Sequence, residues 1–82
     1  MAYSKERLDQ IWDKGKTIRG KDPDLYRADI YGNTMYRRSY GLYSPMGWNV
    51  DHSNPQANGG SNNLRNLQPM NSRANSSKGD KR

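Results

Sequence analysis

The residues best suited to chemistry gather in one stretch, residues 47–80, which reads GWNVDHSNPQANGGSNNLRNLQPMNSRANSSKGD. This stretch holds the only histidine of the chain, His52, directly after the carboxylate of Asp51. It also holds the densest set of side-chain oxygens, which are the donors that hard divalent cations prefer. A lone histidine is usually a polar surface or hydrogen-bonding group. The pattern around His52 therefore decides whether it takes part in a site.

The sequence before and after the pair predicts where its side chains lie. The β-branched and aromatic run at residues 48–50 leads into Asp51 and His52, and the proline of residues 53–55 interrupts the strand because it lacks the ladder donor. We expect the pair to close a strand. Successive strand side chains point to opposite faces, so the two neighbours can serve one site only where the backbone bends at the strand's end.

The rest of the stretch predicts a loop, a strand and a helix. Residues 56–63 are polar and Gly-rich, which is typical of a compact Ω-like loop. Residues 64–68 are long enough for one strand, which we expect to end at Pro69. A polar helix is then expected over about residues 70–77, with Gly79 as its stop.

With these residues in place, the stretch resembles the HNH nuclease family, in its H-N-N form. The family's motif begins with an Asp-His pair, here Asp51-His52, and continues through a mid-loop asparagine, here Asn66. It ends with a helical His or Asn followed by Lys-Gly, here Asn75 and residues 76–80. The resemblance implies a small α+β domain with a ββα-metal (His-Me finger) core, as in small bacterial and phage HNH endonucleases.

The resemblance also implies roles for these residues. His52 would be the general base that deprotonates water, and its imidazole is well populated as the free base near neutral pH. Asp51 and Asn75 would hold a divalent cation, for which an all-oxygen donor set favours Mg²⁺ or Mn²⁺. Asn66 would pin the loop to the strand end, and it is counted with His52 among the catalytic residues. The implied products carry 5′-phosphate and 3′-hydroxyl ends.

The front of the chain resembles the family more weakly, over Asp22 to Tyr40. Residues 31–32, Tyr-Gly, stand where small bacterial and phage relatives often carry Cys-Gly. Many relatives bind a structural zinc through paired cysteines, and this chain has no cysteine. We therefore expect no structural zinc.

The charge pattern favours a polyanionic partner, which the resemblance implies to be DNA. The formal net charge is +6 and the pI is about 9.8. Residues 1–30 hold seven basic and six acidic side chains, whereas residues 31–82 hold seven basic and two acidic. Contacts to phosphates position a duplex without reading its sequence. The candidates, with Lys78 first because it shares a helix face with Asn75, are Lys78, Arg73, Arg65, Lys81 and Arg82.

Length and composition predict one small folded domain over residues 1–82. Hydrophobic residues make up 30% and the mean hydropathy is −1.32, but two Trp and six Tyr can bury large surfaces while keeping one wet edge. No apolar run approaches the length of a membrane span. We expect a cytoplasmic protein without a membrane partner, although a secreted toxin also fits the composition.

Ahead of the motif, the sequence predicts a helix and a short β-hairpin. The helix is expected over about residues 5–14, capped by Ser4, with Leu8, Ile11 and Trp12 on one face. Residues 25–30 fit either a strand or a helical turn, and residues 35–40 suggest a strand that pairs back after a turn.

The function expected from these features is a metal-dependent HNH endonuclease that nicks or cuts DNA. Two other functions remain open. One is a DNA-binding or assembly module that keeps the ββα scaffold without cleaving, against which the retention of Asp51, His52 and Asn75 together argues. The other is a toxin-type nuclease domain, or one that works with a phage packaging machine.

Overall fold

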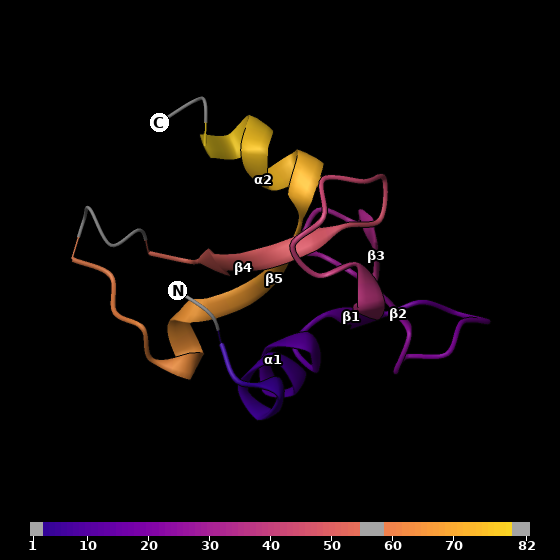
Figure 1. Cartoon of the computed structure of the whole chain (residues 1–82), viewed down its shortest axis with the longest axis horizontal. Coiled ribbons are helices and arrows are strands. Elements are labelled where there is room, and N and C mark those ends of the chain that lie inside the picture. Colours follow the sequence, from indigo (N-terminus) through magenta and orange to yellow (C-terminus); the bar gives the residue numbers. More distant parts are fainter. Residues whose placement is uncertain (1–2, 55–58, 80–82) are drawn as a thin grey trace.

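The computed structural model describes residues 3–54 and 59–79. Within these residues the chain forms a small α+β structure of two helices and two antiparallel sheets (Figure 1). The elements in chain order are α1 (Lys5–Trp12), β1 (Lys16–Thr17), β2 (Tyr26–Ala28), β3 (Thr34–Tyr36), the 3₁₀ turn η1 (Arg37–Ser39), β4 (Trp48–His52), the 3₁₀ turn η3 (Leu64–Asn66), β5 (Leu67–Asn71) and α2 (Ser72–Gly79).

Helix α1 begins where the sequence predicts and ends earlier. The Ser4 hydroxyl accepts a hydrogen bond from the Arg7 backbone N–H at 3.1 Å, which satisfies one of the free donors at the helix start. At the other end the backbone tightens, because Gly15 N donates to the Trp12 carbonyl three residues earlier. The helix therefore ends at Trp12 rather than near Lys14.

The predicted hairpin belongs to a three-stranded sheet, in which β2 is the central strand. Residues 25–30, left open between strand and helical turn, contain strand β2, which pairs with β3 and also with β1. Strand β3 ends at Tyr36 rather than Tyr40, because the chain turns into η1. Strand β1 is not predicted by the sequence: it has two exposed residues and shows no alternation of polar and apolar side chains.

Strands β4 and β5 form the second sheet, with Trp48 opposite Asn71 and His52 opposite Leu67. The predicted strand over residues 64–68 is wrong in both bounds. Residues 64–66 form η3, and β5 continues through Pro69 to Asn71. Strand β5 pairs on one side only, and such an edge accommodates a proline whose nitrogen faces the unpaired side.

Helix α2 starts at Ser72, two residues later than predicted, and Asn71 explains the difference. The Asn71 Oδ1 atom accepts hydrogen bonds from Arg73 N at 3.0 Å and Ala74 N at 3.3 Å. An asparagine in this position is one of the preferred N-cap residues. Because Asn71 also belongs to β5, the strand passes directly into the helix.

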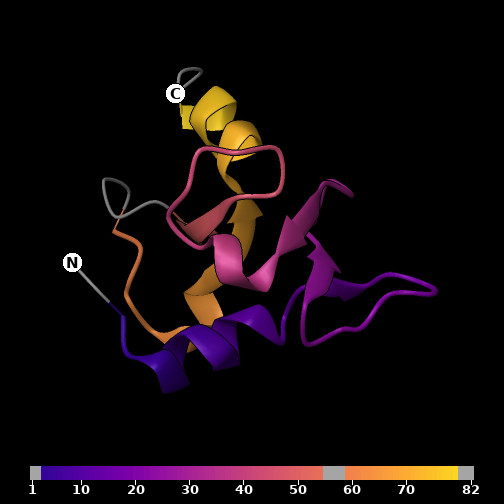
Figure 2. The ribbon, with the colours of Figure 1, turned by 45° about the vertical axis from the view of Figure 1, so that its right-hand side comes forward.

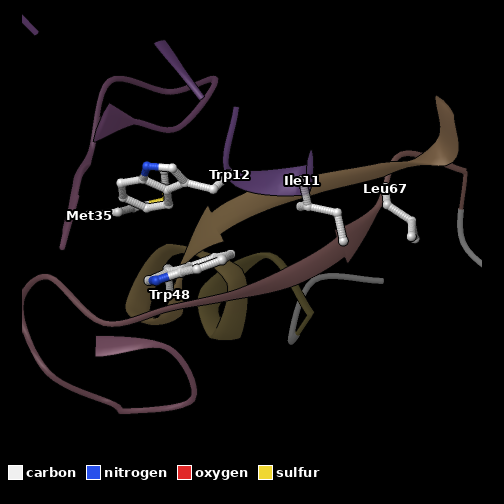
Figure 3. Close-up of a cluster of buried hydrophobic side chains, with 5 residues drawn as sticks. All are labelled: Ile11, Trp12, Met35, Trp48 and Leu67. Atoms are coloured by element: carbon white, nitrogen blue, oxygen red, sulfur yellow. The ribbon is translucent and has the colours of Figure 1, made fainter. Parts of the chain in front are cut away.

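The main core lies between α1 and the β4–β5 sheet (Figure 3). The Trp12 and Trp48 rings lie 5.0 Å apart between centroids, and their indole N–H groups donate to the Pro23 and Arg37 carbonyls. Helix α2 lies on the other side of the sheet from α1 (Figure 1). The buried cluster consists of Ile11, Trp12, Met35, Trp48 and Leu67.

Candidate functional site

Asp51 lies near the end of β4 and is almost fully buried, with 5% of its surface exposed. Gln68, directly across the ladder, donates from Nε2 to Asp51 Oδ2 at 2.9 Å. This contact holds the carboxylate through a neutral amide. A buried carboxylate held in this way presents a hard oxygen donor in a fixed direction.

Helix α2 is tied to the face of β4 that carries Asp51. Asn49 Nδ2 donates to the Ser72 hydroxyl at 2.9 Å, joining the strand to the first helical residue. Asp51 is two residues beyond Asn49 and so shares its face of the strand, whereas Asn75 is three residues beyond Ser72 and so shares its side of the helix. Figure 1 shows β4 and α2 running in the same direction. These spacings put Asp51 and the half-buried Asn75 on facing sides.

His52 is the last residue of β4 and is half-buried. Strand alternation directs it to the opposite face from Asp51, and the chain bends at residues 53–54 directly after the pair. The imidazole Nε2 lies 2.7 Å from Asn62 Oδ1 in the following loop. The ring therefore has a fixed orientation at the end of β4, on the opposite face of the strand from Asp51.

Asn66 closes the loop that follows His52. Its Oδ1 accepts from Asn54 N at 2.8 Å, and its Nδ2 donates to the carbonyls of Asn54 at 3.1 Å and Ser61 at 2.6 Å. The bonds join the end of β4 to residues 61–67, called the return segment here. This is the loop closure that the resemblance implies. The catalytic assignment of Asn66 stays a prediction. Part of the expected Ω-like loop, residues 55–58, lies outside the described residues.

Basic side chains of α1 and of the turn directly after it hold the backbone of the same return segment. Arg7 donates to the Asn62 carbonyl at 3.1 Å, and Lys14 donates to the carbonyls of Leu64 and Leu67. Burial, together with the positive charge of Arg7, lowers the pKa of the Lys14 ammonium. Helix α1 therefore positions the segment that carries the partner of His52.

An ion pair ties α1 to η1. Arg37 donates to Asp9 Oδ1 at 2.7 Å and, with Lys5, holds the pKa of Asp9 below its ordinary value of 3.8. The third shifted group is Tyr40, whose pKa is raised by burial. None of these three groups belongs to the candidate site. Their pKa shifts therefore reflect contacts in the structure around the site, not in the site itself.

The predicted phosphate-binding residues are placed unevenly. Arg73 is exposed at the start of α2, and Arg65 is exposed on η3, where it borders a pocket beside Lys14 and Lys16. For Lys78 the backbone of α2 is described but the side chain is not. Lys81 and Arg82 lie outside the described residues.

Sequence reasoning missed the residues that support the site, above all Asp29. This carboxylate is 1% exposed and accepts from the backbone N–H groups of Tyr31 and Asn33 in the β2–β3 turn. Its other oxygen accepts from Asn71 N at 3.1 Å, at the junction of β5 and α2. An aspartate shortly before Gly32 and Asn33 is a local signal for the turn. No local signal reveals the bond to Asn71.

Asn62 and Gln68, the partners of His52 and Asp51, were missed as well. Gln68 follows from the register of β4 and β5, which becomes readable only once β5 is known to continue to Asn71. Asn62 is one of several asparagines in a polar loop, and nothing in the sequence separates it from its neighbours.

No family model, curated protein or solved structure was found to match this chain. Within the described part of the chain, none of the helices has the length and apolar character needed to cross a membrane.

Proposed function

We propose that this chain is a metal-dependent HNH endonuclease that hydrolyses phosphodiester bonds in DNA, with β4, β5 and α2 as a ββα-metal core. The observation that carries the proposal is the Asn49–Ser72 tie between β4 and α2. By spacing, that tie brings the faces of Asp51 and Asn75 together, beside the strand end where His52 is held.

The donor set fits a hard divalent cation. Asp51 offers a carboxylate and Asn75 an amide oxygen, and Mg²⁺ and Mn²⁺ favour such oxygen ligands. When bound, the cation would offset negative charge on the phosphate and stabilise the departing 3′ oxygen. The Gln68 amide supports the Asp51 carboxylate by donating a hydrogen bond from Nε2 to Oδ2 at 2.9 Å.

The residues at the end of β4 and in the following loop carry out and support the proton transfer. The His52 imidazole takes the proton of the attacking water and becomes imidazolium, while the resulting hydroxide forms the new bond to phosphorus. Asn62 holds the ring in place, and Asn66 keeps the return segment closed around it. An oriented base of this kind lowers the barrier because the water need not be captured by a freely rotating side chain.

The charge distribution supports a polyanionic substrate. Between residues 30 and 79 the only acidic side chain is Asp51, and it is buried. The exposed surface of β4, β5 and α2 therefore carries no carboxylate to repel phosphates, whereas Arg73 is exposed on α2 and Arg65 is exposed on the adjoining turn η3. Such a surface binds DNA largely without sequence preference.

The direct test is a plasmid-nicking assay with and without added divalent metal. We expect nicking that depends on metal, and His52→Ala should lower cleavage by roughly 10²–10⁴-fold while DNA binding persists. Binding by the variant in a gel-shift assay shows that it remains folded. Cleavage by His52→Ala at the wild-type rate would refute the mechanism, and binding without nicking in any metal would favour a non-catalytic DNA-binding module.

A metal series tests the ligand set separately. Mg²⁺ or Mn²⁺ should support nicking, whereas Zn²⁺ should support little, since it prefers imidazole nitrogen and would occupy the lone pair of His52. Asn75→Ala should lose activity, and Asn75→His should shift preference toward Zn²⁺ or Ni²⁺. Unchanged metal preference in Asn75→His would remove Asn75 from the ligand set.

A further inference from the structure

An exposed apolar loop lies beside α2 and has no part in the site described above. This loop, residues 41–47, is called the tip loop here. Three of its side chains face solvent although they are large and apolar: Tyr43 is 66% exposed, Leu42 54% and Met46 42%. Figures 1 and 2 both show the tip loop against the first turn of α2.

The base of the tip loop is held firmly. Gly41 N donates to the Trp48 carbonyl at 2.8 Å, and Asn71 Nδ2 donates to the Pro45 carbonyl at 2.9 Å. Ser72 N donates to the Gly47 carbonyl at 2.8 Å, which ties the loop to the first residue of α2. At Gly47 a Cβ atom would lie 1.8 Å from the Leu42 carbonyl oxygen, so the two ends of the loop touch. The apolar side chains are therefore presented by a fixed backbone.

The side chain of Arg73 lies over the aromatic ring of Tyr43 in the tip loop. The Arg73 guanidinium lies 5.4 Å from the centroid of the Tyr43 ring, within the range of a cation–π contact. Arg73 precedes Asn75 by two residues on α2. The tip loop therefore stands next to the helix that carries the candidate metal ligand.

The chemistry of this surface selects its partner. It combines exposed aromatic and aliphatic groups with an arginine, and no acidic side chain occurs between residues 30 and 50 or between residues 52 and 79. An apolar protein partner would have to desolvate the Arg73 charge without pairing it, which is costly. A nucleic acid matches both the apolar groups and the charge, since its bases stack on aromatic rings and its phosphates pair with arginine.

We propose that the tip loop binds an unpaired base of DNA, which stacks on Tyr43 while Arg73 pairs with the adjoining phosphate. This inference rests on the proposed function insofar as DNA is taken as the substrate. It adds a preference for single-stranded or locally unpaired DNA beside the cleavage site. Stacking of this kind tolerates any base, because every base has a π face.

The test measures binding with chelator present, so that no cleavage can occur. The probe is a short single-stranded oligonucleotide containing 2-aminopurine, whose fluorescence falls when the base stacks, compared with the same oligonucleotide paired in a duplex. The wild-type chain should quench the single-stranded probe. Tyr43→Ala should weaken single-strand binding by roughly five- to hundred-fold and abolish the quenching, with a smaller effect on the duplex.

The chain offers a matched control. Tyr31, in the β2–β3 turn, is 64% exposed, nearly the same as Tyr43, and belongs to a different loop from the tip loop. Tyr31→Ala should bind both probes as the wild type does, and Tyr43→Phe should retain the quenching because it keeps the ring. Circular dichroism of each variant checks the fold. Leu42→Ser, which leaves Tyr43 in place, is a second test variant and should show an intermediate loss of single-strand binding.

The outcomes separate this inference from the nuclease proposal. Equal binding by Tyr43→Ala and Tyr31→Ala, or no quenching by the wild-type chain, would overturn the stacking surface while leaving the nicking assay unaffected. Quenching that depends on Tyr43 would support the surface even if no metal gave cleavage, in which case only the nuclease proposal fails.

Discussion

At the scale of single residues, the contact between His52 and Asn62 holds the imidazole ring that we propose as the base. The Nε2 atom of the ring and the Oδ1 atom of Asn62 lie 2.7 Å apart, within hydrogen-bonding distance. The Asn62 backbone is in turn fixed by Arg7 of α1. In the proposed mechanism, Asn62 is therefore a positioning residue that acts through His52.

This role predicts a specific kinetic pattern for Asn62 variants. Asn62→Ala should lower kcat roughly five- to tenfold with little change in KM, in keeping with the loss of one hydrogen bond of about 1 kcal/mol. Asn62→Asp should move the acidic limb of the pH–rate profile to higher pH, because a carboxylate stabilises the imidazolium form. The exposed neighbour Asn63 supplies the control. Asn63→Ala should leave both kcat and the pH–rate profile unchanged. An unshifted limb in Asn62→Asp would contradict the assignment.

At the scale of elements, Asn71 is the junction at which β3, β5, the tip loop and α2 meet. Its amide nitrogen donates to the carbonyls of Thr34 at 3.0 Å and Pro45 at 2.9 Å, and its oxygen caps α2. The backbone N–H of Asn71 donates to the buried Asp29 carboxylate. One residue thus sets the start of the helix that carries Asn75 relative to the sheet that carries Asp51.

Removing this junction should cost substantial stability. Asn71→Ala loses the helix cap, worth about 1 kcal/mol, and leaves two part-buried carbonyls without their donor, so the free energy of unfolding should fall by about 2–4 kcal/mol. Asn71→Ser keeps a capping hydroxyl but does not reach both carbonyls, so it should recover only part of the loss. Urea denaturation measures both, and Asn63→Ala should stay within about 0.5 kcal/mol of wild type. Equal stability of Asn71→Ala and wild type would show that the junction contributes nothing.

At the scale of the whole molecule, the described fold is held by side-chain packing between α1 and the β4–β5 sheet. The cluster around Trp12 and Trp48 is apolar, and its indole N–H groups are satisfied by backbone carbonyls. The chain has no cysteine with which to build a thiolate metal site. The fold should therefore not depend on a structural metal.

Chelation should accordingly separate activity from folding. Excess chelator is expected to stop nicking while the far-ultraviolet circular dichroism signal and the thermal midpoint change little, because the metal proposed here serves chemistry rather than the core. Adding Mg²⁺ back should restore nicking. Loss of the dichroism signal on chelation would show instead that a metal holds the fold together.

The sequence alone determined the features that depend on near neighbours along the chain. The Ser4 cap, the buried pair Ile11 and Trp12 and the strand that ends at His52 follow from capping, helical periodicity and a chain-breaking proline, and the structure confirms each. The strand, loop, strand and helix that carry the candidate site also appear in the predicted order. The candidate residues Asp51, His52, Asn66 and Asn75 come from the same local pattern, and their chemical roles stay predictions.

Only the tertiary structure decided the features that depend on residues far apart in sequence. Strand β5 runs through Pro69 because β5 pairs along one edge alone, and α2 starts at Ser72 because the Asn71 side chain caps it while bonding β3 and the tip loop. The Asp29–Asn71 bond spans 42 positions and the Arg7–Asn62 bond spans 55. Local propensity carries no information about such pairs, since each forms only when packing of the core brings its two segments together.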